Sequence, residues 1–288
     1  MASPLVSVVL PVHDGERFLA EAVDSILGQT LGDLELVVVD DGSTDATRSI
    51  LAGYDDPRLR VVAQPHRGLV AALGAGIAET GAAYLARMDA DDVSEPRRLE
   101  RQLELLERQP RVGMAATWVA VVDEEGRELR RHVLPPGHDD LARRLLLRNP
   151  FQHGSVLLRR AALDAAGGYR GDYGANEDYD LWRRLARSWE LACVPEVLYR
   201  YRVHAGAVTQ TDPERIARRE RLRSELWRDY DAGAYDVRGT VARARAAEPE
   251  IRHGLEADQR ALAREALRRG RPRLAVKALA ASLALSRG

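Results

Sequence analysis

The first ninety residues alternate short apolar segments with segments of helical periodicity, and this alternation limits the fold more than any other feature of the chain. The spacing of Leu19, Val23 and Ile26 places them on one face of the first expected helix. Strands that alternate with helices form a parallel sheet covered by helices on both faces, so the sequence predicts an α/β fold. Strands are expected over Leu5–Val12, Leu34–Asp40, Arg58–Ala63 and Ala83–Asp89, and helices over Arg17–Leu27, from a cap at Ser43 or Thr44 to about Ala52, and over Leu69–Glu79.

The pattern changes after Pro96, and from Pro213 onward the chain is rich in Ala and Arg with a helical period, interrupted near Gly233, Gly239 and Pro249. We therefore expect two parts, an α/β domain over residues 1–210 and a C-terminal helical region over residues 211–288. Between Pro96 and this boundary, the pattern predicts a helix marked by Leu99, Leu103 and Leu106, a strand over Val112–Val122, a helix over about Asp139–Leu147, a strand over Ser155–Arg159, a flexible loop at Gly167 and Gly168, and a helix over Tyr179–Arg187.

We expect a cytoplasmic protein. No apolar run approaches the roughly 20 residues that span a bilayer, and the N-terminal residues lack the charged and apolar segments of a secretory signal. The single cysteine, Cys193, excludes an intramolecular disulfide and suits a reducing compartment. We expect Cys193 to be a small buried core residue.

The net charge of −1 hides an asymmetry along the chain. Residues 213–288 contain 18 Arg and Lys against 11 Asp and Glu, whereas residues 1–212 contain 25 against 33. A nucleic-acid binder usually has its basic face on the folded domain, so we do not expect nucleic acid as a partner. The carboxylates of the first part instead suit a divalent cation.

The first acidic cluster, Asp40-Asp41-Gly42-Ser43-Thr44-Asp45, follows the second expected strand. Ligands of open α/β sheets bind beyond the carboxyl ends of the strands. A carboxylate there, Asp41 above all, can accept a hydrogen bond from a base N–H or a ribose hydroxyl. The alternative is an Asp-rich turn that Gly42 permits, with a helix cap at Ser43 or Thr44.

The second acidic cluster, Arg87-Met88-Asp89-Ala90-Asp91-Asp92, follows the fourth expected strand. Three carboxylates in four residues repel one another unless a cation or basic groups neutralise them. Mg²⁺ and Mn²⁺ take oxygen ligands and bridge protein carboxylates to substrate phosphates, so Asp89 and Asp91 are candidate ligands. Asp92 can instead cap the helix after Pro96. The alternative, a solvated acidic loop, is harder to hold directly after an apolar strand.

The third acidic cluster, Asn176-Glu177-Asp178-Tyr179-Asp180, opens an expected helix. Acidic residues favour a helix N-terminus through the macrodipole, and this alone can explain one or two of them. In a functional interpretation, one carboxylate is a general base that reaches an acceptor hydroxyl. His204 is a candidate metal ligand and His153 a weaker one, because a lone histidine is more often structural.

Other motifs are absent or incomplete. Gly74 and Gly76 match the first two glycines of a dinucleotide fingerprint, but Glu79 stands where the third belongs. The chain has no Walker-type phosphate loop, no Cys/His spacing for zinc and no G-x-S-x-G elbow. Dehydrogenase, ATPase and serine hydrolase functions are therefore disfavoured.

The order of the clusters resembles that of family 2 glycosyltransferases with the GT-A fold, over about residues 5–205. This resemblance implies a Rossmann-like, mostly parallel sheet flanked by helices, with the C-terminal helices as an appendage. Four ordered motifs are more specific than any one alone. They are VSVVLPVHDGERFLAEAVDSILGQT, LELVVVDDGSTD, YLARMDADD and NEDYDLW.

The resemblance assigns roles to individual residues. The nucleotide is held by the segment after the first strand and by the DDGS motif, which corresponds to Pro11, Val12 and Asp41, and more weakly to Asp40. The D-x-D motif, Asp89-Ala90-Asp91, is implied to bind the metal and the donor diphosphate, with Asp91 as the more direct ligand.

The E-D motif matches Glu177-Asp178 and implies that Asp178 is the catalytic base. A histidine after the last core strand often completes the metal site in GT-A enzymes, which matches His204. Gly167 and Gly168 resemble the glycine loop near which donor sugar and acceptor meet.

The function implied is transfer of a sugar from a nucleoside-diphosphate sugar, with UDP the commonest nucleotide, to a hydroxyl of a glycan, lipid-linked or small-molecule acceptor in cell-surface glycan or polysaccharide synthesis. Mn²⁺ or Mg²⁺ would neutralise the leaving diphosphate, and a single displacement assisted by Asp178 would invert the anomeric centre. The alternatives are a sugar nucleotidyltransferase, which usually has a glycine- and Lys/Arg-rich phosphate loop that this chain lacks, and a non-catalytic nucleotide-sugar-binding homologue.

The C-terminal region combines leucines with arginines over Leu255–Leu285. A basic amphipathic helix can lie on an anionic membrane, here the inner face, and would suit a lipid-linked acceptor. We favour the alternative, a helical hairpin packed on the body or on a second subunit of a homo-oligomer. The residues concerned are Leu262, Leu267, Leu274, Leu279 and Leu283 with Arg260, Arg264, Arg268, Arg269, Arg271 and Arg273.

Overall fold

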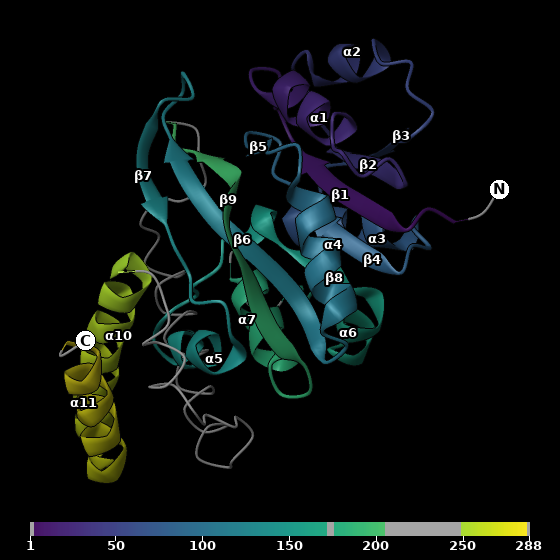
Figure 1. The fold of residues 1–288 in the computed structure, drawn as a ribbon. Coiled ribbons are helices and arrows are strands. Elements are labelled where there is room, and N and C mark those ends of the chain that lie inside the picture. The colour runs from purple at the N-terminus through teal and green to yellow at the C-terminus, as the bar shows by residue number, and fades with distance from the viewer. Residues whose placement is uncertain (1–2, 172–175, 205–248, 287–288) are drawn as a thin grey trace.

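The computed structural model describes residues 3–171, 176–204 and 249–286. Within them, one sheet of nine strands has the order β3-β2-β1-β4-β8-β6-β9-β5, and β7 pairs with β6. Figure 1 shows this sheet curling between helices, so the predicted α/β fold is confirmed. The strands are β1 (Val6–Val12), β2 (Leu34–Asp41), β3 (Leu59–Gln64), β4 (Tyr84–Arg87), β5 (Val93–Ser94), β6 (Val112–Val122), β7 (Glu128–His132), β8 (Leu157–Arg159) and β9 (Glu190–Arg202).

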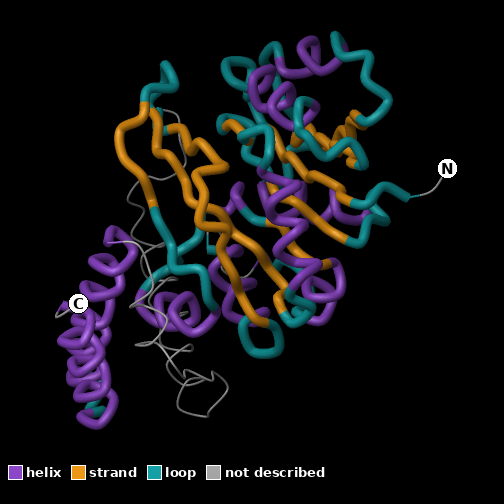
Figure 2. The backbone as a smooth tube through the Cα atoms, in the orientation of Figure 1, coloured by secondary structure: helices purple, strands orange, loops and turns teal. Residues whose placement is uncertain are grey.

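Helices flank the sheet, and two further helices lie in the described C-terminal residues 249–286 (Figure 2). The helices are α1 (Leu19–Leu27), α2 (Thr47–Ala52), α3 (Leu69–Ala78), α4 (Arg98–Arg108), α5 (His138–Leu147), the 3-10 turn η1 (His153–Ser155), α6 (Arg160–Ala165), α7 (Glu177–Leu185), α10 (Pro249–Arg268) and α11 (Pro272–Ser286).

The first half of the sheet is parallel, as predicted. Strands β3, β2, β1 and β4 run in the same direction. Because side chains alternate along a strand, Val8 and Leu10 pack in one core cluster with the buried face of α1, whereas Val9 packs in another with Leu73 of α3. All four carboxyl ends therefore meet at one edge of the sheet, where the first two acidic clusters lie.

The second half of the sheet is mixed. Its strands β5, β7 and β9, and the neighbouring helix α6, were not predicted from the sequence pattern. Strand β8 is antiparallel to both of its neighbours, and β9 runs parallel to β6. In β9, Pro195 and Glu196 interrupt the apolar pattern. Both residues lie at a register shift between Val194 and Val197, because proline has no N–H to donate and is accommodated at a bulge.

The two predicted helix caps are wrong, because the capping residues make longer-range contacts. Helix α2 begins only at Thr47 and has no side-chain cap. Ser43 instead accepts a hydrogen bond at Oγ from the Asp14 N–H at 3.0 Å, and the Thr44 N–H donates to the Asp14 carboxylate at 2.7 Å. Helix α4 also lacks a side-chain cap, and Asp92 is buried against β9.

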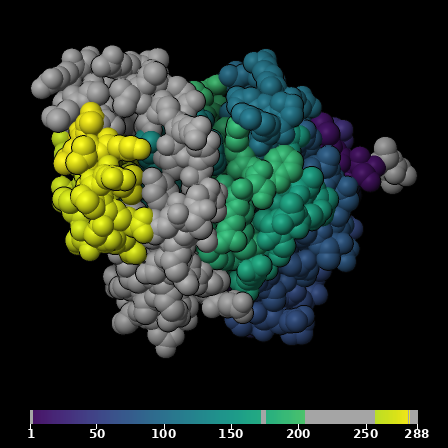
Figure 3. Space-filling model, turned by 90° about the horizontal axis from the view of Figure 1, so that it is seen from below, coloured from purple at the N-terminus to yellow at the C-terminus, as the bar shows by residue number. Residues whose placement is uncertain are grey.

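The described C-terminal helices pack on the body. Leu262 and Ala266 of α10 share a core cluster with Leu141 of α5, and the Arg144 Nε atom lies 2.6 Å from the Asp258 carboxylate. Figure 3 shows α10 and α11 at the surface of the molecule. No helix among the described residues is long and apolar enough to cross a membrane. The predicted boundary near residue 210 and the breaks near residues 233 and 239 lie outside the described residues.

Candidate active site

Asp41, at the end of β2, uses both of its oxygens within the protein. Its Oδ1 accepts hydrogen bonds from Gln64 Nε2 at 2.6 Å and from the Arg67 N–H at 2.8 Å. Its Oδ2 accepts one from the Gly68 N–H at 2.8 Å and lies 3.0 Å from His66 Nδ1. Burial raises the pKa of Asp41, but these hydrogen bonds outweigh it and hold the pKa below its ordinary value. Asp41 therefore fixes the turn between β3 and α3.

Asp40 and the end of β1 complete this edge. The Asp40 carboxylate is buried and accepts hydrogen bonds from the Ser43 N–H at 2.8 Å and from Arg48 Nε at 2.6 Å. Pro11 and Val12 are buried, and the Val12 side chain packs in the core, so this segment offers mainly backbone to a ligand.

Two histidines lie over the same edge. The rings of His13 and His66 have centroids 4.1 Å apart, and both Nδ1 atoms lie within 3.1 Å of the Asp41 carbonyl oxygen. This pair of tilted rings lies beside Asp41, next to the edge where the nucleotide is predicted to bind.

The second acidic cluster is divided between exposed and buried carboxylates. Asp91 Oδ2 lies 3.0 Å from His204 Nε2, with the two side chains 35% and 15% exposed. Asp89 instead pairs with Arg87, Oδ1 to Nη1 at 2.5 Å. Of the three predicted metal ligands, the structure therefore brings Asp91 and His204 together. No group of three His, Cys, Asp or Glu side chains within the described ranges gathers closely enough to enclose a metal ion.

The Asp91–His204 pair nevertheless fits a divalent cation that a substrate helps to hold. A carboxylate oxygen and an imidazole nitrogen are ligands for Mn²⁺, and Mg²⁺ also accepts carboxylates together with phosphate oxygens and water. The Phe18 ring packs beside the His204 ring, with ring centroids 5.1 Å apart.

Asp92 is buried and anchors this loop, residues 89–92, to β9. It accepts hydrogen bonds from the Tyr199 hydroxyl and the Arg202 N–H, both at 2.7 Å. Burial, together with the charges of Asp89 and Asp91, raises the pKa of Asp92 well above its ordinary value. The Tyr199 hydroxyl also accepts a hydrogen bond from the Asp89 N–H at 3.3 Å and so joins the two ends of the acidic loop to β9.

The third acidic cluster forms the first turn of α7. Asp178 Oδ2 accepts a hydrogen bond from Asn149 Nδ2 at 2.6 Å, and Oδ1 accepts one from the Tyr179 N–H at 2.6 Å. Burial raises the pKa of Asp178, and the neighbouring Glu177 carboxylate raises it further; His153 and these hydrogen bonds oppose the rise without cancelling it. Asp178 keeps partial exposure, whereas Glu177 is buried.

His153 lies in the turn η1 and contacts residues around the start of α7. In the structure its Nε2 atom lies 2.7 Å from the Tyr169 hydroxyl, its Nδ1 atom lies 3.5 Å from the Glu177 carboxylate, and its ring meets Trp182 edge to face. Burial and the charge of Arg87 lower the pKa of His153 to about 4, so its imidazole is neutral near pH 7. The short motif of His153, Gly154 and Ser155 before a strand is the signal that could have found it.

Gly154 brings the turn η1 against the second acidic cluster. A Cβ atom on Gly154 would lie 1.9 Å from the Tyr199 hydroxyl oxygen and 2.6 Å from Asp89 Oδ2. Only glycine fits this close approach. One short turn therefore touches the acidic loop through Gly154 and the start of α7 through His153.

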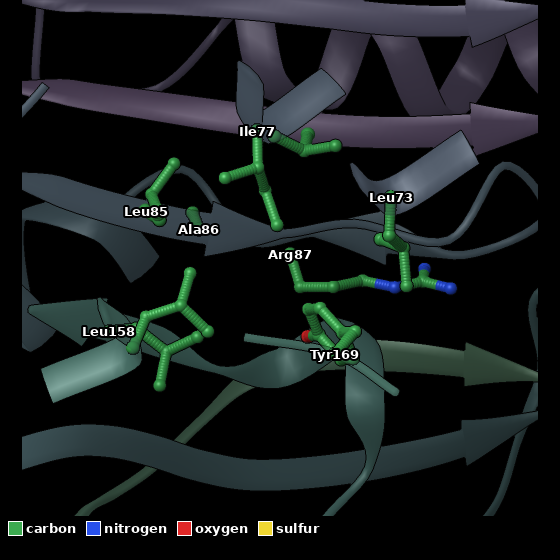
Figure 4. Close-up of a pocket in the computed structure, with 9 residues that line it drawn as sticks. Leu73, Ile77, Leu85, Ala86, Arg87, Leu158 and Tyr169 are labelled. Atoms are coloured by element: carbon green, nitrogen blue, oxygen red, sulfur yellow. The ribbon is translucent and has the colours of Figure 1, made fainter. Parts of the chain in front are cut away.

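Arg87, whose guanidinium pairs with Asp89, also lines a small cavity beside Tyr169 (Figure 4). The close-up shows its side chain running past the Tyr169 ring, beside apolar residues of α3, β4 and β8. Burial lowers the pKa of Arg87, but the adjacent Asp89 outweighs it, so the guanidinium stays charged. The cavity here has room for about 10 Å³, roughly one water molecule, and so cannot hold a nucleotide sugar.

An α/β sheet with acidic clusters beyond the carboxyl ends of its parallel strands is typical of enzymes that bind nucleotides. The family model described as Glycosyl transferase family 2 matches residues 7–167. The chain belongs to this family and is a glycosyltransferase.

Two relatives have named pathways. The O-antigen biosynthesis glycosyltransferase WbnJ of Escherichia coli is 30% identical over 69% of this chain and 80% of its own length. The amylovoran biosynthesis glycosyltransferase AmsE of Erwinia amylovora is 30% identical over 72% of this chain and 79% of its own length.

Solved structures identify the fold as GT-A. Staphylococcus aureus TarS 1-349 in complex with UDP-GlcNAc matches with a TM-score of 0.60 and 14% identity, covering 95% of this chain and 90% of that one. The mannosyltransferase PcManGT from Pyrobaculum calidifontis, in complex with GDP-Man and Mn²⁺, matches with a TM-score of 0.55 and 19% identity, covering 99% and 87%.

Proposed function

We propose that this glycosyltransferase moves a sugar from a nucleoside-diphosphate sugar to a hydroxyl acceptor, with inversion, in the synthesis of a surface polysaccharide. The observation that supports this most is the turn η1, because one short turn contacts both the acidic loop and the first turn of α7. A donor held at the acidic loop, residues 89–92, would thus lie close to a carboxylate in the first turn of α7. The names of the relatives WbnJ and AmsE support polysaccharide synthesis as the setting.

The nucleotide would bind across the ends of β1 and β2. The backbone of Pro11 and Val12 and the carboxylates of Asp40 and Asp41 line this edge in the structure. Since the Asp41 oxygens already accept hydrogen bonds from the turn after β3, its contribution to base binding would include holding this turn in place.

The donor diphosphate would bind near Asp89, Asp91 and His204. A divalent cation bound there supplies Lewis-acid stabilisation of the charge that develops on the leaving diphosphate. In this chain Asp91 and His204 would hold the ion, and Asp89 would join them only on leaving Arg87. PcManGT is described with Mn²⁺, which supports this ion as the first to test.

Asp178 would accept the proton of the attacking hydroxyl. Its raised pKa brings its basicity nearer to what proton transfer near neutral pH requires, and its partial exposure leaves it accessible. A single displacement from the face opposite the diphosphate inverts the anomeric carbon, and no covalent enzyme nucleophile takes part. Glu177 would fix the first turn of α7 next to His153.

A donor screen tests this proposal. Purified protein with Mn²⁺ or Mg²⁺ would be incubated with UDP-, GDP- and dTDP-sugars, and release of nucleoside diphosphate would be compared between wild type and Asp91→Ala. We expect release with one donor, lost on EDTA addition and in the variant, with UDP-GlcNAc first to be tried because TarS is described with it. Neither release nor calorimetric binding of any donor with metal present would refute the proposal.

We also propose that the hairpin of α10 and α11 contacts an anionic membrane surface. Leu267, Val276 and Leu279 are 56%, 65% and 44% exposed. Every exposed charged side chain described in the two helices is a cation, whereas Asp258 and Glu265 pair with arginines. Apolar side chains among cations suit the interface of an anionic bilayer. The exposed cations are Arg260, Arg264, Arg268, Arg273 and Lys277.

Vesicle flotation tests this contact. We expect the intact protein to float with phosphatidylglycerol vesicles but not with phosphatidylcholine vesicles, and Lys277→Glu combined with Val276→Ser to reduce flotation. A protein that stays in the lower fraction with both vesicles would remove the membrane proposal and leave the packing on the body as the role of these helices.

A further inference from the structure

Asn149 follows α5 and contacts the predicted base from outside its helix. Its Nδ2 donates to Asp178 Oδ2 at 2.6 Å, while its Oδ1 accepts a hydrogen bond from the Phe151 N–H at 3.1 Å. The second contact determines the orientation of the amide. Because only the oxygen of an asparagine side chain accepts, the NH₂ group must face the carboxylate.

The segment that holds Asn149 is itself fixed against α7. The Phe151 ring is buried and meets Trp182 of α7 edge to face, with ring centroids 6.3 Å apart. On its other side, His132 Nε2 lies 2.8 Å from the Pro150 carbonyl oxygen. Burial lowers the pKa of His132, so its neutral ring donates this hydrogen bond near pH 7. Asn149 and Asp178 are therefore held in one rigid unit.

The surroundings of Asp178 would otherwise favour its protonated form. Glu177 adds a second negative charge and burial removes water; a charged His153 would oppose both, but its pKa of about 4 leaves it neutral near pH 7. Against these, each oxygen of Asp178 accepts one neutral donor, from Asn149 and from the Tyr179 backbone. Hydrogen bonds to the ionised form stabilise it, and, as far as the described residues go, each oxygen keeps a further lone pair for an acceptor hydroxyl.

We propose that Asn149 is a positioning residue that keeps Asp178 ionised and directs its free lone pairs toward the acceptor. This inference rests on the proposed role of Asp178 as base. A structural role alone, closing the turn to the Phe151 N–H, needs only the oxygen of Asn149. The two roles are separated by Asn149→Asp, which keeps an oxygen for Phe151 and replaces the donor by a second carboxyl group.

The direct test is a ¹³C NMR titration of protein labelled at the aspartate carboxyl carbon, without substrate. The signal of Asp178 is identified by its absence in Asp178→Asn. We expect Asn149→Ala to tighten proton binding at Asp178 roughly tenfold, since one hydrogen bond to a charged group is lost, and Asn149→Asp to tighten it more. Asn149→Ser, which keeps an oxygen for the Phe151 N–H, replaces Asn149→Ala if that variant does not fold. Arg148→Ala, an exposed neighbour, should leave the titration unchanged.

The second readout is the pH profile of UDP release from UDP-GlcNAc, or from whichever donor the screen identifies. We expect the acid limb of kcat/KM to move to higher pH in Asn149→Ala and to stay in place in Arg148→Ala. An Asp178 titration that does not move, or a lower rate with an unmoved acid limb, would overturn the inference. Full turnover by Asp178→Asn would instead refute the base assignment, whatever the Asn149 variants show.

Discussion

The acidic loop after β4 and the first turn of α7 contain carboxylates in very different surroundings. Arg87 lies against Asp89, the Arg202 N–H donates to Asp92, and His204 contacts Asp91. Asp178 instead receives its described hydrogen bonds from neutral donors only. Asp89 is therefore neutralised by the Arg87 guanidinium, whereas Asp178 has no charged hydrogen-bond donor among the described residues and is kept at a raised pKa.

This difference separates two tasks that both need carboxylates. A carboxylate that must hold a cation and a diphosphate works best when it stays ionised, and nearby positive charge ensures that. A carboxylate that must take a proton works best when its pKa is raised toward the working pH. The environment, rather than the residue type, therefore divides the roles, and four changes test this division.

The largest effect is expected for Asp178→Asn. Loss of a general base lowers turnover about 10²- to 10⁴-fold. The pKa of Asp178 is higher in the folded than in the unfolded state. The free energy of unfolding therefore falls as the pH rises from the ordinary carboxyl pKa to the raised one. The asparagine side chain of the variant cannot ionise, so urea denaturation should find the variant more stable than wild type near pH 7 and equally stable below that window. Equal stability at both pH values would contradict the burial argument.

Asp91→Ala should act on metal binding rather than on stability. Mutation of a residue that only hydrogen-bonds to a metal ligand weakens metal binding roughly 10- to 100-fold. Removing Asp91, one of the two proposed ligands, should weaken Mn²⁺ binding by at least that factor. Calorimetric titration with Mn²⁺ and nucleoside diphosphate measures it. Asp123→Ala, a partly exposed carboxylate in the β6–β7 turn, is the control and should bind as wild type does. Unchanged binding in Asp91→Ala would place the metal elsewhere.

Gly154→Ala tests whether the turn η1 connects the acidic loop after β4 to the first turn of α7. The added Cβ would overlap the Tyr199 hydroxyl and crowd Asp89, and overpacking of this kind costs about 1–3 kcal/mol. Gly74→Ala is the matched control, because its Cβ would meet no atom within 4 Å and helix α3 should gain about 0.5–1 kcal/mol. Thermal denaturation compares the two, and an equally stable Gly154→Ala would show that the turn can move.

The smallest effect is expected for Arg87→Leu. Burial and the Arg87 charge lower the pKa of His153 to about 4. Removing the positive charge should raise the pKa of His153 but leave it below its ordinary value, since the burial remains. Titration of the histidine ring signals by NMR measures this shift. A pKa that stays in place would mean that the two groups are not electrostatically coupled.

The parallel half of the fold was predictable because apolar β-branched strands and amphipathic helices alternate there without interruption. Strand β9 was not, because Pro195 and Glu196 break its pattern and only pairing with β6 makes the segment a strand. The caps at Ser43 and Asp92 failed for a similar reason. Each residue makes a contact distant in sequence, which no local signal contains.

The candidate site follows the same rule. The acidic residues stood out in the sequence because clustered carboxylates are costly without a purpose. Asn149 and His153 carry no charge near pH 7, and their contacts with Asp178 and Glu177 exist only after folding. The pairing of Asp89 with Arg87 could be seen only in the structure, because the spacing alone left Asp89 and Asp91 equivalent.

The division of roles is tested most directly by measuring donor binding and turnover together in Asp178→Asn and Asp91→Ala. Calorimetry with Mn²⁺ and the donor from the screen would be paired with nucleoside diphosphate release. We predict that Asp178→Asn binds donor as wild type does but turns over at least roughly 10²-fold more slowly, and that Asp91→Ala loses metal-dependent binding. An Asp178→Asn variant that turns over normally, or an Asp91→Ala variant that binds the donor and metal normally, would contradict the account.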